Sequence, residues 1–233
     1  MSYPIKGLSM SAQVIQIVEK HFFSHDILRL RLKAEAPIEF YAGQYILLGF
    51  DREILKPFSI AVAPDGSGEL ECHIRHNPHS PWMQTLFTKE IGDRLYWQGP
   101  IDHICLREQT KPTIFVAGGT GFALMKALLE KQLQSIPKYP IHIYWGVRQE
   151  ADLYQHDWLV KLSRQHDNID YTPVISEADA NWQGITGWVH NAVLKDFPIL
   201  ENFVVYLCGP AEMQQVAKQA FLAAGLTEEN FVY

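Results

Sequence analysis

The chain has 233 residues, 47% of them hydrophobic and 20% charged, with a formal net charge of −6, ordinary values for a globular protein of one large or two modest domains. The mild acidic balance argues against a nucleic-acid partner, which needs a basic face, and neither a membrane span nor an apolar leader in the first ten residues is expected. The three cysteines, Cys72, Cys105 and Cys208, form no CxxC pair, which disfavours a cysteine-held metal site and indicates a reducing, cytoplasmic compartment.

Residues 1–110 are predicted to form a domain of short antiparallel strands. In Asp26–Lys33 three leucines alternate with Arg29, Arg31 and Lys33, the period of a strand with one buried face. A single helix is predicted over Pro81–Lys89, with Ser80 as its N-cap. The remaining predicted strands are Ala12–Glu19, Gln44–Phe50, Pro57–Val62, Glu69–Arg75, Arg94–Gln98 and His103–Leu106. Short strands separated by turns, with one helix among them, predict a small barrel.

Residues 111–233 have a different rhythm, in which apolar runs alternate with longer helical patterns. Such runs are typical of strands buried on both faces of a parallel sheet, so this half is predicted to be a doubly wound α/β domain. The predicted strands are Thr113–Ala117, Ile141–Trp145, Ile169–Ile175 and Phe203–Cys208, and the predicted helices are Phe122–Gln134, Ala151–Gln165, Trp188–Asp196 and Ala211–Ala224.

A glycine-rich turn, Gly118-Gly119-Thr120-Gly121, joins the first of these strands to a helix. Glycines let a ligand approach the backbone closely, and a helix N-terminus offers unpaired N–H groups, which suits a pyrophosphate. The spacing is not GxGxxG, so a plain strand–helix turn without a ligand is the alternative.

Three further motifs are candidate ligand sites. Lys56-Pro57-Phe58-Ser59 places a cation, an aromatic ring and a hydroxyl within four residues, although on its own it also fits ordinary strand packing. Arg148 follows the second parallel strand and can meet an adenosine ribose or a 2′-phosphate, or lie free in solvent. Cys208-Gly209-Pro210 ends a strand at the carboxyl edge of the sheet, where ligands of open α/β folds bind, or is a buried thiol before a turn.

In this order the motifs resemble those of the ferredoxin–NADP+ reductase superfamily, and within it the bacterial NAD(P)H:flavin oxidoreductases that supply luciferase. Lys56–Ser59 is similar to the family's flavin motif, Arg-x-(Tyr/Phe)-Ser, and Ala42–Tyr45 resembles its "AGQY" strand start. Gly118–Gly121, Tyr144–Arg148 with its following Asp-Leu-Tyr, and Cys208–Pro210 with Met213 are similar to the family's pyridine-nucleotide motifs.

The resemblance implies a six-stranded Greek-key barrel for the flavin and an α/β domain for NADH or NADPH. It implies that Ser59 bonds near flavin N5, that the pyrophosphate lies on Gly119–Gly121, and that Cys208 and Gly209 flank the nicotinamide, whose hydride passes to N5. Ser59 and Cys208 are thus the expected catalytic residues, with Lys56, Pro57, Phe58, Gly118, Thr120, Arg148 and Pro210 completing the binding sites. No metal is expected.

Lys56 departs from the family's arginine. A lysine is a point charge and cannot grip a flavin phosphate in two places. Residues 75–80 also lack the glycines of relatives that retain FAD. Riboflavin, FMN or FAD is therefore expected to bind loosely and leave reduced, for a flavin-dependent monooxygenase or a ferric acceptor downstream.

Two rival functions remain. The same motifs would serve a reductase that keeps FAD and passes electrons to a partner protein, or a regulatory domain that binds nucleotide without turnover. Bound yellow flavin would favour the first, and an NADH oxidation assay would test the second. His73, His76 and His79 are expected to be ordinary polar surface rather than metal ligands, because their spacing does not converge in a strand and loop.

Overall fold

The structure, a computed structural model, describes residues 11–233. The first ten residues, where no leader is expected, lie outside the described residues. The chain divides into two compact units. The first unit runs to Cys105 and also takes in Lys126–Lys131; the second consists of Leu106–Met125 and Gln132–Tyr233.

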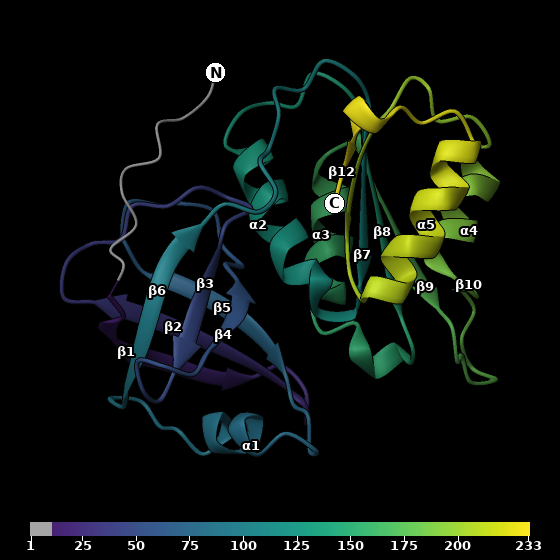
Figure 1. Ribbon diagram of the computed structural model, residues 1–233. Helices are drawn as coiled ribbons and strands as arrows, with labels where there is room; N and C mark the ends of the chain where they lie inside the picture. The colour runs from purple at the N-terminus through teal and green to yellow at the C-terminus, as the bar shows by residue number, and fades with distance from the viewer. Residues whose placement is uncertain (1–10) are drawn as a thin grey trace. The chain divides into compact units, whose positions relative to one another are not determined.

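The first unit is an antiparallel sheet of six strands in the order β4-β3-β6-β1-β2-β5 (Figure 1). The insertion of β6 between β3 and β1 gives the non-consecutive pairing of a Greek key. Beyond β4, the Ala61 N–H donates to the Glu71 carbonyl of β5 at 2.8 Å, which joins the two ends of the sheet. The elements are β1 (Gln13–Phe22), β2 (Ile27–Ala34), β3 (Tyr45–Gly49), β4 (Leu55–Ser59), β5 (Leu70–Arg75), α1 (Pro81–Phe87) and β6 (Arg94–Ile101).

Alternation places the core of this unit as predicted. Leu28, Leu30 and Leu32 of β2 are fully buried, whereas Arg29 and Arg31 point to the other face. The Ser80 side chain caps α1 by accepting from the Met83 N–H.

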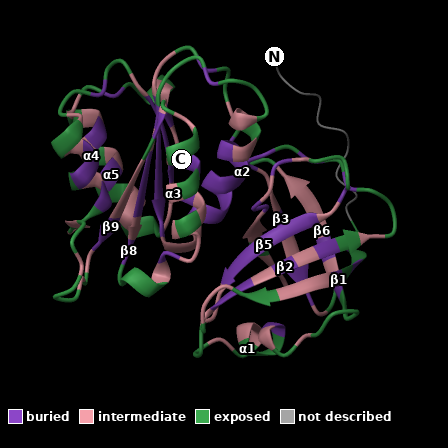
Figure 2. Ribbon diagram, turned by 180° about the vertical axis from the view of Figure 1, so that it is seen from behind, coloured by how far each residue is buried: buried purple, intermediate pink, exposed green. Residues whose placement is uncertain are grey.

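The second unit is a parallel sheet in the order β10-β9-β8-β7-β11-β12. The strands run outward from β7 in both directions, so the switch point of the topology lies between β7 and β11. Helices cover both faces, with α3 on the opposite face from α4 and α5 (Figures 1 and 2). The elements are β7 (Thr113–Gly118), α2 (Phe122–Leu133), β8 (Ile141–Val147), α3 (His156–Gln165), β9 (Ile169–Ile175), β10 (Ile185–Thr186), α4 (Val189–Asp196), β11 (Val204–Cys208), α5 (Ala211–Ala223) and β12 (Phe231–Val232).

Some predicted elements were wrong. His103–Leu106 is not a strand; Ile104 is buried and its N–H donates to the Gly43 carbonyl, so its apolar side chain belongs to a packed loop. The helix predicted from Ala151 begins at His156, because Gln149 and Asp152 cap a separate 3-10 turn over Glu150–Asp152. The two-residue strands β10 and β12 were not predicted, since they are too short to show a period.

Candidate functional site

The predicted flavin motif of the first unit folds as strand β4. Ser59 ends the strand opposite Tyr45 of β3, and Phe58 pairs with Ile46. Lys56, Phe58 and Ser59 are partly buried and Pro57 is exposed. Among the described residues, the Ser59 hydroxyl has no hydrogen-bond partner and the Lys56 ammonium has no ion pair. Both groups are therefore available to a ligand.

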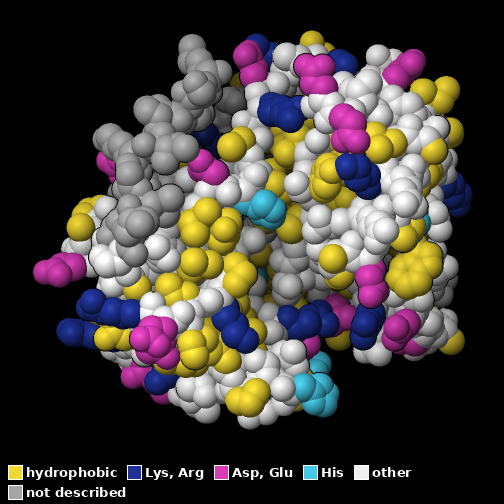
Figure 3. All heavy atoms as spheres, viewed as in Figure 1, with side chains coloured by type: hydrophobic (Ala, Val, Ile, Leu, Met, Phe, Trp, Pro, Cys, Tyr) yellow, Lys and Arg dark blue, Asp and Glu magenta, His cyan; other side chains and the backbone are white. Residues whose placement is uncertain are grey.

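Aromatic rings surround this strand. The Phe58 ring stacks on Trp82 of α1 with centroids 5.8 Å apart, and the Lys56 ammonium lies 5.2 Å from the centroid of the same Trp82 ring. The Trp82 indole nitrogen is buried without a hydrogen-bond partner among the described residues, so packing against the core and ring contacts hold this side chain. The contact with the Trp82 ring therefore gives the Lys56 ammonium a weak but specific position before any ligand binds. Figure 3 shows one face of the molecule, on which Lys and Arg side chains lie among hydrophobic ones.

The glycine turn of the second unit meets the end of β11. A Cβ on Gly121 would lie 2.4 Å from the Cys208 carbonyl oxygen, and a Cβ on Gly209 would lie 3.1 Å from the Gly118 Cα. These two backbones therefore touch at the carboxyl edge of neighbouring strands. Gly118–Gly121 and Cys208–Gly209, far apart in sequence, are brought together at the switch point of the sheet.

Gly119 is the residue of the turn that needs positive φ. Its φ is +53°, and a Cβ there would have no heavy atom within 4 Å. The buried Trp145 indole donates to the Gly119 carbonyl at 2.9 Å, which fixes the turn from behind. Thr120 is partly buried beside it. The turn thus presents bare backbone to open space at the start of α2, an arrangement that fits a pyrophosphate.

The other predicted residues of this unit lie at the same edge. Gly118 pairs with Gly146 of β8, and the exposed Arg148 follows the end of that strand. Burial raises the pKa of the Cys208 thiol to about 11, so at neutral pH it is a protonated thiol and no nucleophile. Pro210 is exposed and precedes α5.

A buried polar cluster was missed by the sequence analysis. His73 was expected on the surface, but its side chain is fully buried and its Nε2 lies 2.9 Å from Glu71 Oε1. Burial lowers the pKa of His73, so the ring is a neutral donor. Burial alone would raise the pKa of Glu71, but the His73 hydrogen bond and the charge of Lys126 hold it well below its usual range. The signal was present as Glu71 and His73 two residues apart on one strand face.

Comparison with known proteins decides the family. Residues 14–105 match the oxidoreductase FAD-binding domain and residues 115–219 the oxidoreductase NAD-binding domain. The chain is 34% identical over 202 residues to an NAD(P)H-flavin reductase of Vibrio harveyi, covering 83% of this chain and 84% of that protein. The chain belongs to the family of oxidoreductases with an FAD-binding and an NAD-binding domain that includes this NAD(P)H-flavin reductase. The predicted family, the two-domain fold and the flavin and pyridine-nucleotide cofactors are thereby confirmed.

Two further proteins are similar to this chain, one in sequence and one in fold. The chain is 38% identical over 209 residues to the CDP-6-deoxy-L-threo-D-glycero-4-hexulose-3-dehydrase reductase of Yersinia pestis, covering 88% of this chain but only 62% of that protein. Its fold resembles that of the ferredoxin reductase in carbazole 1,9a-dioxygenase, with a TM-score of 0.87 at 23% identity, covering 98% of this chain and 70% of the other. No helix in residues 11–233 is long and apolar enough to cross a membrane.

Proposed function

We propose that this protein reduces free flavin at the expense of NAD(P)H and releases the product. The observation that carries the proposal is strand β4, where, among the described residues, the Ser59 hydroxyl has no hydrogen-bond partner and the Lys56 ammonium has no ion pair. Both groups are therefore available to a ligand that lies against this strand. The 34% identity to a Vibrio harveyi flavin reductase over most of both chains supports the same function.

In this proposal the first unit binds the flavin and the second binds the nucleotide, each through a few side-chain or backbone groups. Lys56, Phe58 and Ser59 contact the flavin, and Ser59 orients its ring by a hydrogen bond near N5. The N–H groups of Gly119–Gly121 bind the pyrophosphate of the nucleotide, Arg148 meets its adenosine end, and Cys208-Gly209-Pro210 lies beside the nicotinamide. When both are bound, the nicotinamide supplies the hydride that the flavin accepts, so the chain needs no acid or base of its own.

Ser59→Ala is expected to raise the flavin dissociation constant about twofold to tenfold, the cost of one hydrogen bond. The fold should survive, because alanine fits where serine fits and the Ser59 side chain bonds to no described protein group. Flavin fluorescence titration measures the constant, and a thermal melt checks the fold. Unchanged affinity and unchanged NAD(P)H oxidation would show that Ser59 only extends the β4 ladder.

The purified protein is expected to be largely colourless and to accept riboflavin, which carries no phosphate. The reason is that Lys56 offers one point charge, already held over the Trp82 ring, where a forked arginine would grip a phosphate. The experiment is an absorbance spectrum after gel filtration, followed by NAD(P)H oxidation with riboflavin, FMN and FAD in turn. A stoichiometric yellow complex would overturn this prediction, and no oxidation with any flavin would overturn the proposed function.

The alternative is a reductase that retains its flavin and passes electrons to a partner protein. The observation in its favour is the 38% identity to the Yersinia pestis protein, which is named as the reductase of a dehydrase. Since the chain spans 62% of that protein, its activity is carried over only as a proposal. The colour test above separates the two functions.

The downstream acceptor is proposed to be a flavin-dependent monooxygenase or a ferric chelate, since released reduced flavin can diffuse to either. A cytoplasmic location is proposed on the free thiols Cys72, Cys105 and Cys208, which suit a reducing compartment.

A further inference from the structure

Past Ser59, the Ile60 N–H still donates to the Gln44 carbonyl at 3.0 Å, and from Ala61 onward side chains of helix α2 join in the backbone hydrogen bonding. The Ala61 carbonyl accepts from Lys126 Nζ at 2.9 Å, and the Ala63 N–H donates to Glu130 Oε2 at 3.0 Å. On the other side, the Ala61 N–H donates to the Glu71 carbonyl. Residues 61–63 are therefore fixed by groups outside their own strand, starting two residues beyond Ser59.

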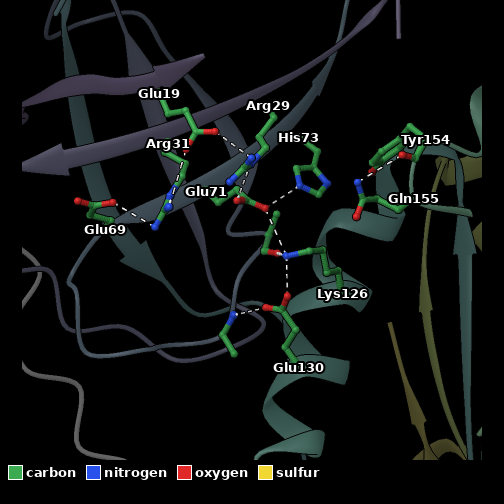
Figure 4. Close-up of polar contacts among 12 residues, drawn as sticks. Glu19, Arg29, Arg31, Glu69, Glu71, His73, Lys126, Glu130, Tyr154 and Gln155 are labelled. Atoms are coloured by element: carbon green, nitrogen blue, oxygen red, sulfur yellow. Dashed lines mark hydrogen bonds and ion pairs between the residues drawn. The ribbon is translucent and has the colours of Figure 1, made fainter. Parts of the chain in front are cut away.

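Lys126 is the centre of this arrangement, as Figure 4 shows. Its side chain is only 10% exposed, and its ammonium lies 2.7 Å from Glu130 Oε1 and 3.3 Å from Glu71 Oε1. Glu71 is held in turn by Arg29 Nε at 2.8 Å on its other oxygen and by His73. The ammonium thus has acceptors from three separate segments: α2 itself, β5, and the chain after β4.

Charged groups buried in such a network add little net stability to a fold. Burying an ammonium and carboxylates removes their hydration, and their mutual attraction compensates for that loss only when the geometry is good. Apolar residues of the same volume usually stabilise a fold as well or better. What directional charged bonds add is a defined position for the backbone they hold. The backbone held here is the continuation of the strand that ends at Ser59.

We propose that Lys126 is a positioning residue for Ser59: by fixing Ala61, with Glu130 fixing Ala63, it sets where the Ser59 hydroxyl lies for the flavin. This inference rests on the proposed function, because it takes Ser59 as a flavin contact. Lys126 acts through the backbone and touches no reactant. Removing the Lys126 side chain should therefore weaken the same contact with the flavin that Ser59→Ala removes, and no other.

The test is a double-mutant cycle read by flavin binding in the absence of NAD(P)H. Lys126→Met, Ser59→Ala and the double variant are titrated with riboflavin, following flavin fluorescence. Each single variant is expected to raise the dissociation constant about twofold to tenfold, and the double variant no further than either one, because all three lose the same bond. Lys126→Arg should restore most of the affinity, since a guanidinium can also donate to Ala61 and Glu71.

Two controls keep the result interpretable. Lys131→Met removes an exposed lysine from the same helix and should leave riboflavin affinity unchanged. Should Lys126→Met fail to fold, Glu130→Ala replaces it in the cycle, because Glu130 is 27% exposed and its loss leaves the Lys126–Glu71 pair in place.

The possible outcomes distinguish failure of this inference from failure of the proposed function. If the losses from Lys126→Met and Ser59→Ala multiply, or Lys126→Met lowers thermal stability without changing riboflavin affinity, Lys126 is only a structural residue and the inference fails. If the unaltered protein binds no riboflavin, the proposed function itself fails.

Discussion

Gly119→Val is expected to raise the Michaelis constant for NAD(P)H about tenfold to a hundredfold and to leave flavin affinity unchanged. Gly119 has φ +53° and faces open space, so a side chain would occupy the position proposed for the pyrophosphate. Losing one or two hydrogen bonds to a charged phosphate accounts for a factor of this size. Flavin affinity should hold because Lys56, Phe58 and Ser59 belong to the other compact unit. Steady-state kinetics and a riboflavin titration measure the two effects.

Backbone strain needs its own control, because valine is poorly tolerated at positive φ. Asparagine adopts this conformation far more readily, yet it also places a side chain in the open space. Gly119→Asn should therefore melt close to the unaltered protein and still lose affinity for NAD(P)H. If Gly119→Asn uses NAD(P)H normally and only Gly119→Val fails, strain is the cause and the nucleotide does not lie on this turn.

Much of the fold could be predicted from local sequence patterns. The alternation of Leu28, Leu30 and Leu32 with charged residues predicts both the strand and its buried face, and burial confirms it. The continuous apolar run Thr113–Ala117 likewise predicts a strand buried on both sides. Each of these signals is complete within one element, because side-chain period and burial are local properties.

The candidate site is less local. The glycine turn and the Cys208 motif are separately visible in the sequence, but their contact depends on β7 and β11 being neighbours, which no local pattern contains. Only the resemblance to the family predicted that the glycine turn and the Cys208 motif lie together. The roles of these residues stay predictions until the variants are measured.

Lys126 shows what sequence reasoning misses. In the apolar stretch Phe122–Leu129, Lys126 fits a helix position facing solvent, yet its ammonium is buried against Ala61 and Glu71. Those partners lie on segments more than fifty residues away, so only the tertiary structure identifies them. The contact between Trp82 and Lys56 was not predicted either, because it joins helix α1 to strand β4, and strand β5 separates the two in sequence.

Gly121→Ala is expected to damage the nucleotide site more than any other single methyl group in the turn. The added Cβ would lie 2.4 Å from the Cys208 carbonyl oxygen and 2.9 Å from the Gly209 nitrogen, both backbone atoms that no side-chain rotation can move. The start of α2 and the end of β11 must therefore separate, which disturbs Gly119–Gly121 and Cys208-Gly209 together. NAD(P)H oxidation should fall at least about a hundredfold. The melting temperature should drop by about 2–12 °C, since overpacking of this kind costs roughly 1–3 kcal/mol and each kcal/mol lowers the melting temperature of a protein of this size by about 2–4 °C.

A matched control separates this steric effect from the loss of a glycine as such. Gly66 has φ +86° and nothing within 4 Å of its Cβ position, so Gly66→Ala adds strain without a clash and should cost little activity. A Cβ on Gly118 would meet the Met213 sulfur at 2.4 Å, in a flexible side chain that can turn away, and the Pro210 Cδ at 3.0 Å, so Gly118→Ala should fall between the other two variants. This order of effects follows from which atoms block the methyl group. An equal loss in all three variants would mean that replacing a glycine as such, rather than the close approach of two strand ends, lowers activity.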